Sequence, residues 1–394
     1  MNPTRSMVIA ASAAIVGLLP LLLVGALAVQ LTGELGFGTA ALGAVVAVFR
    51  STSAATAPFL GRAADRLGSS TSLRVAGMAT AVTCIGVATT ASSWGTLVPW
   101  MILGGAAIGL AQPAANRLIV TGVPARRRGM AFGVKQTSAP GASTLAGLSV
   151  PVIALTVGWR YAYVLAAVLA VVMVLSVRRS ADGPDPGSRL TSRPPPIQDR
   201  MSLAFFGLAF GLANAANSVM LAFYVDAAVD AGTSASLAGT LLALASVAAI
   251  AVRLTTGIAS DRMHSGHLHL CAYLMLAGAV GLGLLSTQQP GLMGVGLIVG
   301  LSGAWGVHAV FWFVLMNAYS TTPGTATGLV ATVGHTGGTI GPLLFGIVAQ
   351  EVTYRAAWGM GSVFSVAAAT MMVVLARRLA RRRPDKGQHL DTKE

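Results

Sequence analysis

The sequence predicts an all-α membrane protein with twelve transmembrane helices in two related six-helix halves. Three observations support this fold class. Of the 394 residues, 54% are hydrophobic and only 10% are charged, whereas soluble proteins carry about 25% charged residues. Apolar stretches long enough to cross a bilayer recur along the chain. Short motifs of the first half also return in the second half at a nearly constant offset.

Twelve apolar windows approach the roughly 20 residues that a membrane-spanning helix needs. In the first half they cover residues 7–30, 38–60, 73–92, 96–121, 130–156 and 160–178. In the second half they cover residues 201–225, 234–258, 268–286, 291–318, 325–349 and 356–377. The first window follows a single early arginine and is long enough to span, so we expect an uncleaved first helix.

A polar, proline-rich stretch, RRSADGPDPGSRLTSRPPPIQDR, separates the two sets of windows. This composition cannot build a packed core and is typical of a linker. The predicted organisation is therefore an N-terminal six-helix bundle, a cytoplasmic linker, a C-terminal six-helix bundle and a basic cytoplasmic tail. These segments cover residues 1–178, 179–200, 201–378 and 379–394.

The basic residues predict the orientation of the chain in the membrane. Most of the 26 lysines and arginines fall at the chain ends, in the linker and in one set of loops, whereas the opposite loops hold only Arg160 and Arg355. The positive-inside rule places both termini in the cytoplasm of a multi-pass inner (plasma) membrane protein. The net charge of +14 thus reflects topology and not a nucleic-acid partner.

Three motif pairs reveal an internal repeat. GRAADR begins at Gly61 and GIASDR at Gly257, an offset of 196 residues (257 − 61). GWRYAY places Arg160 against Arg355 of TYRAAW, an offset of 195 (355 − 160). The glycines of AFG and ATG, at 133 and 328, again differ by 195 (328 − 133). Because each half has an even number of spans, the repeats are expected to run parallel about an axis along the membrane normal.

GRAADRLGSS resembles the loop motif between helices two and three of the major facilitator superfamily, and GIASDR resembles its degenerate copy between helices eight and nine. Ser69 and Ser70 stand where that pattern usually has a basic pair. The resemblance implies alternating access, in which two bundles rock around a central cavity. Helix capping and topology alone are the simpler alternative for these motifs. The resemblance assigns a gating role to Gly61, Asp65, Arg66, Gly68, Gly257, Asp261 and Arg262.

Away from the ends of the predicted spans, four basic residues and none of the 12 acidic residues fall within them. The four are Arg50, Arg117, Lys135 and Arg253. A charge at mid-bilayer costs roughly 2.5–3.5 kcal/mol on insertion scales. Arg50 is the deepest: it precedes Gly61 by 11 residues (61 − 50), or about 16 Å at the helical rise. Snorkelling to the interface or hydrogen bonding to backbone carbonyls is the structural alternative.

The missing counter-ion is predicted to be the transported substrate. In the fold that the resemblance implies, helices five and eight flank the cavity, so Lys135 and Arg253 are expected to approach one anion from both halves. Arg50 and Arg117 would shape the positive field, and Asn214 would face the cavity or bond a neighbouring helix. VRLTTGIASDR also resembles the eighth helix of oxalate/formate and monocarboxylate carriers, whose arginine serves the carboxylate, although Leu254 replaces the usual proline.

Other polar and aromatic residues within or beside the spans carry weaker predictions. His308 and His335 are candidates for proton coupling, with packing or hydrogen bonding as the alternative. The HSGHLH run from His264 has metal-like spacing but lies in a short loop, so no metal site is expected. Trp305, Phe311 and Trp312 are expected to pack or to line the cavity. No cofactor is implied.

The predicted function is a secondary transporter for a small anionic solute, an organic carboxylate, acting as a monomer in the lipid bilayer with protons as a candidate coupling ion. A proton-coupled exporter of drugs or metabolites is the alternative. No carboxylate lies in the spans to drive it, Gly105 replaces the arginine of drug/proton antiporters, and helix five lacks their GPxxGG core. A non-transporting sensor also remains open. No GxSxG, HExxH or P-loop pattern is present, so no enzyme is predicted.

Overall fold

The structure is a computed structural model that describes residues 3–177, 199–263, 265–319 and 323–381. Within these ranges the chain forms helices and no strand. Most of the predicted linker at 179–200 and most of the predicted tail at 379–394 lie outside the described residues.

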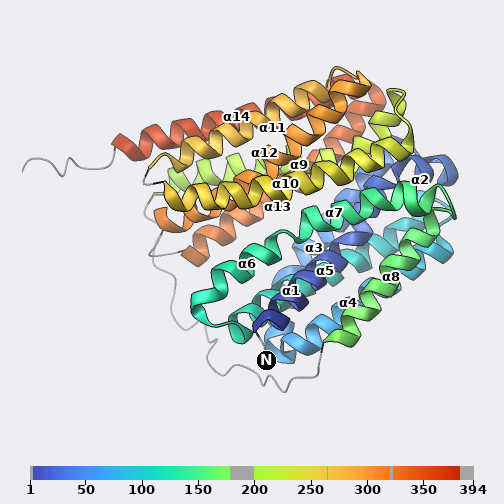
Figure 1. The fold of residues 1–394 in the computed structure, drawn as a ribbon, viewed down its shortest axis with the longest axis horizontal. Helices are drawn as coiled ribbons and strands as arrows, with labels where there is room; N and C mark the ends of the chain where they lie inside the picture. The colour runs from blue at the N-terminus through green and yellow to red at the C-terminus, as the bar shows by residue number, and fades with distance from the viewer. Residues whose placement is uncertain (1–2, 178–198, 264, 320–322, 382–394) are drawn as a thin grey trace, which may run out of the picture.

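The helices of the first half form one group. They are α1 (Pro3–Ala26), α2 (Ala28–Leu35), α3 (Thr39–Leu67), α4 (Ser69–Thr90), α5 (Trp94–Gly122), α6 (Arg128–Gln136), α7 (Ser138–Ser149) and α8 (Trp159–Ser176). A 3₁₀ turn (Ala125–Arg127) precedes α6, and a π-helical turn (Val150–Ala154) follows α7. Figure 1 shows this group on one side of the molecule.

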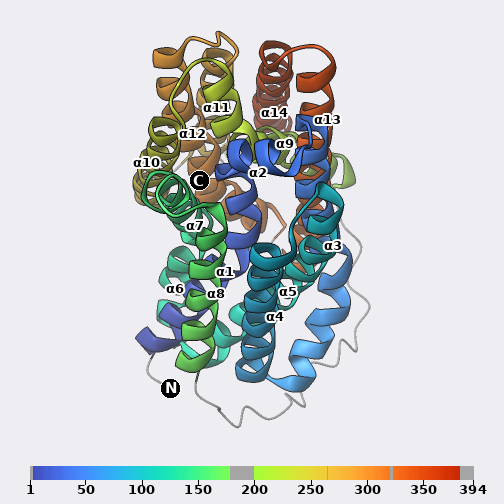
Figure 2. The ribbon, with the colours of Figure 1, turned by 90° about the vertical axis from the view of Figure 1, so that its right-hand side faces the viewer.

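The second half forms the other group. Its helices are α9 (Arg200–Asp230), α10 (Ala235–Arg262), α11 (His267–Leu285), α12 (Pro290–Ala318), α13 (Pro323–Glu351) and α14 (Tyr354–Arg381). Viewed from the end in Figure 2, α9–α14 lie above α1–α8, with α7 next to α10 and α3 next to α13. The two groups correspond to the two six-helix halves predicted from the repeat.

Helix boundaries follow local chemistry. Gly68 ends α3 and precedes α4 with φ of 81°, a value that residues with a Cβ rarely adopt. Ser93 caps α5 through a capping box with Thr96, which satisfies backbone N–H groups that the first turn leaves unpaired. Pro290 occupies the first turn of α12, where its missing N–H costs nothing.

Each of the twelve predicted windows is helical in its described part, but the first and the fifth are each interrupted. Among the described residues, ten helices are long and apolar enough to span a membrane. Window 130–156 instead forms α6, α7 and the π turn, with a break at Thr137. Pro151 falls in the π turn, and a residue without a backbone N–H cannot continue regular α-helical bonding. The predicted twelve-helix fold holds, with breaks at Leu27 in window 7–30 and at Thr137 in window 130–156.

The two groups touch closely at one end, which we call the closed end. A methyl group added to Gly147 on α7 would lie 2.7 Å from the Gly239 carbonyl oxygen on α10. The Ser246 hydroxyl donates to the Ser143 hydroxyl over 2.8 Å between the same helices. On the other side, the backbone N–H of Ala40 on α3 donates to Gln350 on α13 over 3.0 Å. Glycines therefore bring the two backbones into near contact at this end.

The groups separate toward the other end, which we call the open end. Gly133 on α6, Gly257 on α10 and Gly328 on α13 have no atom within 4 Å of an added Cβ. Figure 1 shows α6 diverging from α10, whereas α7 runs beside it. The basic α5–α6 loop lies at this end of the molecule, where the helices of the two groups diverge.

Candidate functional site

Arg253 lies on α10 where that helix crosses α12. The Thr256 hydroxyl contacts the Gly306 carbonyl oxygen at 3.3 Å, so the two helices meet one turn further along. The guanidinium carbon of Arg253 lies 5.8 Å from the ring centroid of Trp305. Arg253 is only 6% exposed, and no described residue accepts a hydrogen bond from its buried Nη1. The structure thus contains a buried guanidinium without a described anionic partner.

His308 belongs to an aromatic cluster beside Arg253. Its Nδ1 lies 2.8 Å from the Ala304 carbonyl oxygen of the same helix. The imidazole is 5.3 Å from the Trp305 ring and 5.4 Å from the Phe210 ring. Packing and one backbone hydrogen bond account for the position of this side chain.

Arg50 reaches from α3 to the other half. Its Nη1 lies 3.0 Å from the position of a Cβ added to Gly338 on α13. The buried Nε has no described acceptor. Arg50 also interacts electrostatically with His335, one turn earlier on α13, and His335 is exposed in this open structure. Arg50 and His335 are therefore neighbouring titratable groups that face each other across the two halves.

Lys135 has two acceptors in its own half. Its Nζ donates to Gln112 over 2.5 Å and to Asn116 over 2.6 Å, both on α5. The residue is 8% exposed. Gln112 and Asn116 were not foreseen, although their spacing of four places them on one helix face. No described contact joins Lys135 to Arg253.

Arg117 lies against the end of α3. Its Nη1 donates to the Asp65 carbonyl oxygen over 2.6 Å, and it is 3.4 Å from the Asp65 carboxylate. From the sequence, Arg117 is expected to be a cation without a counter-ion, because Asp65 falls just beyond the predicted span. The structure instead connects Arg117 to the gating motif.

The rest of that motif lies at the junction of α3 and α4. Gly61 has only Pro113 within 4 Å of an added Cβ, and Arg66 is exposed. Ser69 and Ser70 are 1% and 4% exposed, so a basic pair at these positions would be buried. The departure from the usual motif therefore fits the local packing.

The second copy of the motif is only partly described. Gly257 faces open space, and Arg262 is exposed at the end of α10. The side chain of Asp261 lies outside the described residues. The gating role of this copy stays a prediction.

Two asparagines on α9 differ in their surroundings. The Asn214 amide donates to the Phe210 carbonyl oxygen of its own helix over 2.9 Å and approaches Gly334 on α13. Asn217 is buried, and its side-chain oxygen has no described donor. Asn214 therefore has a local partner, whereas Asn217 does not.

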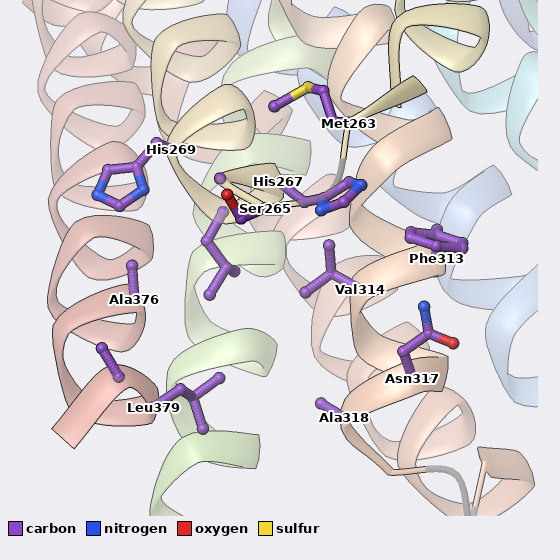
Figure 3. A pocket seen from close by; sticks show the side chains of 13 residues that line it. Met263, Ser265, His267, His269, Phe313, Val314, Asn317, Ala318, Ala376 and Leu379 are labelled. Atoms are coloured by element: carbon purple, nitrogen blue, oxygen red, sulfur yellow. The ribbon is translucent and has the colours of Figure 1, made fainter. Parts of the chain in front are cut away.

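The HSGHLH run lies beside a hollow of about 820 Å³ at the ends of α11, α12 and α14. Figure 3 shows His267 and His269 pointing in different directions from α11. A His267 ring nitrogen lies 3.0 Å from the Ser260 carbonyl oxygen, while His264 lies outside the described residues. Among the described residues, no group of three metal-binding side chains is present.

A family model described as Major Facilitator Superfamily matches residues 6–338 and 208–394. The chain belongs to the major facilitator superfamily. The resemblance drawn from the loop motifs is thereby confirmed, and the protein is a multi-pass membrane transporter of this superfamily. No curated protein sequence matches the chain.

Solved structures of the superfamily share the fold at low identity. The crystal structure of a D-xylose-proton symporter gives a TM-score of 0.76 at 16% identity, covering 94% of this chain and 97% of that chain. The E. coli xylose transporter XylE in an inward open conformation gives 0.77 at 14%, covering 94% and 96%. A bacterial homologue of the human lysosomal transporter Spinster gives 0.70 at 13%, covering 97% and 98%.

Proposed function

We propose that this superfamily member is a secondary transporter for a small anionic solute, an organic carboxylate, and that the two halves move by alternating access. The single observation that carries the proposal is the Arg253 guanidinium, which is buried beside Trp305 with no described acceptor. An anionic substrate would supply the missing partner.

The described ion pairs support this proposal because they leave three of the membrane cations without a carboxylate. They are Arg117–Asp65, Arg160–Glu34 and Arg378–Asp199. Within the described part of the chain, the remaining membrane cations, Arg50, Lys135 and Arg253, thus have no carboxylate partner. Unpaired charge in a bilayer is costly and is usually tied to function.

The chemistry of the donors favours a carboxylate. A guanidinium binds two carboxylate oxygens through parallel hydrogen bonds. Gln112 and Asn116 fix the position of the Lys135 ammonium group. Two of its three N–H donors bond these residues, and the third is available to the substrate. Arg50 adds charge from the opposite side of the interface. We propose Arg253 as the principal contact, with Lys135 and Arg50 as supporting charges and Asn214 at the margin of the site.

The gate is proposed to involve the α3–α4 motif. Arg117 is reassigned from the substrate site to this gate because its described contacts are with Asp65 and Ala64. Breaking these contacts would free α5 to move relative to α3. Gly61, Arg66 and Gly68 belong to the same proposed gate, and Gly257, Asp261 and Arg262 form its second copy.

The proposed setting is the inner (plasma) membrane, with the basic face in the cytoplasm. The open end then faces the cytoplasm, so the structure corresponds to an inward-facing state. Residues 179–200 would connect two six-helix bundles at residues 1–178 and 201–378, and both chain ends would be cytoplasmic. The proposed working unit is a monomer.

Proton coupling is part of the proposal, and His335 is its better-placed candidate. His335 is exposed at the open interface and lies near Arg50. His308 is instead enclosed by Trp305 and Phe210. A histidine near neutral pH can exchange a proton, and a D-xylose-proton symporter is among the structural neighbours.

Uptake into proteoliposomes tests the proposal. Radiolabelled formate, oxalate, lactate and benzoate would each be presented with and without a pH gradient, using protein-free liposomes as the baseline. We expect saturable uptake of at least one carboxylate, competed by other anions and reduced in Arg253→Lys. Transport of cationic or neutral solutes in preference to all four would overturn the anion proposal.

A further inference from the structure

Trp305 carries a second unpaired donor next to Arg253. Its indole Nε1 is buried and has no described acceptor, as is also true of Arg253 Nη1. The guanidinium carbon lies 5.8 Å from the centroid of the Trp305 ring. Two neighbouring side chains, one on α10 and one on α12, thus each bury a donor without an acceptor.

Buried donors without an acceptor are uncommon in folded proteins, and here two belong to neighbouring side chains. Trp358 provides a comparison within the chain. Its indole Nε1 also lacks a described acceptor, but the ring packs on Phe345 at 4.5 Å in the hydrophobic core. No described cation lies over the Trp358 ring. The unpaired N–H of Trp358 thus lies among apolar side chains, whereas the unpaired N–H of Trp305 lies beside an unpaired guanidinium.

The surroundings of Trp305 fix its ring. Arg253 lies over the ring, and His308 lies 5.3 Å from it with an angle of 31° between the two ring planes. The neighbouring Gly306 lets α10 and α12 approach, because an added Cβ would lie 3.2 Å from Val252. The ring contacts therefore account for the position of the indole but provide no acceptor for its N–H.

We propose that Trp305 is a substrate-binding residue whose indole N–H donates to one carboxylate oxygen while Arg253 donates to the other. This inference rests on the proposed anion site and specifies its ligand more closely. The indole N–H is a hydrogen-bond donor without charge. Only an anion with a second acceptor oxygen can bond it while also bonding Arg253, so Trp305 favours carboxylates over a monatomic anion of equal charge. It also sets the orientation of the carboxylate plane relative to α12.

The test measures binding to the purified full-length protein in nanodiscs. The probe is whichever of formate, oxalate, lactate and benzoate binds best, with chloride as the monatomic comparison. Trp305→Phe keeps an aromatic ring at this position and removes the N–H together with part of the indole ring. Trp312→Phe is the matched control, because Trp312 lies on the same helix and contacts Phe210 rather than Arg253 in the described structure.

We expect Trp305→Phe to weaken carboxylate binding by about tenfold or more, as loss of a hydrogen bond to a charged group implies. Trp312→Phe should change binding less than twofold, and chloride competition should be unaffected by either variant. With ¹⁵N-labelled tryptophan, the indole signal that disappears in Trp305→Phe should shift on adding carboxylate to the wild type.

Two failures are distinguishable. If the wild type binds a carboxylate and Arg253→Lys weakens that binding, but Trp305→Phe does not and its indole signal stays fixed, the role of Trp305 is overturned while the anion site stands. If the wild type binds none of the four carboxylates, the proposed function fails and the Trp305 proposal fails with it. If Trp305→Phe does not fold, the Trp305 signal is assigned by elimination with Trp→Phe variants at the other five tryptophans, and its shift in the wild type decides.

Discussion

Lys135 on α6 and Arg253 on α10 are both buried cations, one from each half, and their surroundings differ. Lys135 donates to two amide oxygens at 2.5 and 2.6 Å, whereas Arg253 has an aromatic ring beside it and a buried Nη1 without a described acceptor. The first cation is solvated by its own half. The second has no described acceptor and is proposed to bind the substrate, so the two buried cations are expected to differ in function.

The largest effect is expected at Arg253. Arg253→Ala should weaken carboxylate binding by roughly 10- to 150-fold, which corresponds to about 1.5–3 kcal/mol for a lost charged hydrogen-bond partner. Arg253→Lys should also impair binding because an ammonium group cannot form the two parallel bonds of a guanidinium. Equilibrium binding to folded variants measures both, and unchanged affinity in the alanine variant would remove Arg253 from the site.

Lys135 should respond more weakly to the same substitution. Lys135→Ala is expected to lower carboxylate affinity by roughly two- to fivefold, since two protein acceptors already share its charge. Lys135→Arg should be milder than Lys135→Ala if the residue acts as a point charge. An effect of Lys135→Ala as large as that of Arg253→Ala would contradict the proposed difference between the two residues in substrate binding.

The pairing of Arg117 with Asp65 predicts a kinetic effect. Asp65→Asn should lower the transport rate by several-fold and leave carboxylate affinity nearly unchanged, because the residue biases conformational populations and does not contact the substrate. Initial uptake rates and equilibrium binding, measured on the same preparation, separate the two quantities. Loss of affinity in a protein with unchanged conformational balance would place Asp65 in the site.

The smallest effect concerns Glu34, outside the spans. Hydrogen bonds from Arg160 and then Trp159 hold the pKa of this carboxyl below its ordinary value of 4.5, against a small opposing effect of burial. A depressed folded-state pKa gives a stabilisation that is complete above the unfolded-state pKa and is lost as pH falls through the folded-state value.

Thermal unfolding of wild type and Glu34→Gln from pH 7 to pH 3 measures that contribution. The wild type should be slightly more stable at neutral pH, and the difference should disappear below the depressed pKa. A difference that grew on acidification would contradict the assignment of the Glu34–Arg160 contact. Because the pair is exposed, the difference at neutral pH is expected to be small.

Much of the architecture followed from hydropathy and repeats, since spanning helices and paired motifs leave clear patterns in sequence. The break in the fifth window was not predicted, because Thr137 and Pro151 lie within a stretch whose hydropathy is that of a continuous span. Counting charges was enough to single out Arg253 as a cation within a span, and its role in binding stays a prediction. The partners of Lys135 and Arg117 could not be predicted, because they lie 23 and 52 residues away in the sequence. Whether such residues meet depends on how each helix is rotated about its axis. The unpaired indole of Trp305 is a property of packing that no residue pattern reveals.

The glycine contacts of the closed end have a mechanical consequence. Because backbone meets backbone at Gly147 and Gly239, the helices can tilt there without interlocked side chains having to disengage. A helix such as α3, with 29 residues, is about 43 Å long, so a tilt of about 10° at one end displaces the other by roughly 7 Å. Under the proposed alternating access, a small tilt at the closed end would therefore give a displacement at the open end wide enough to admit a small solute.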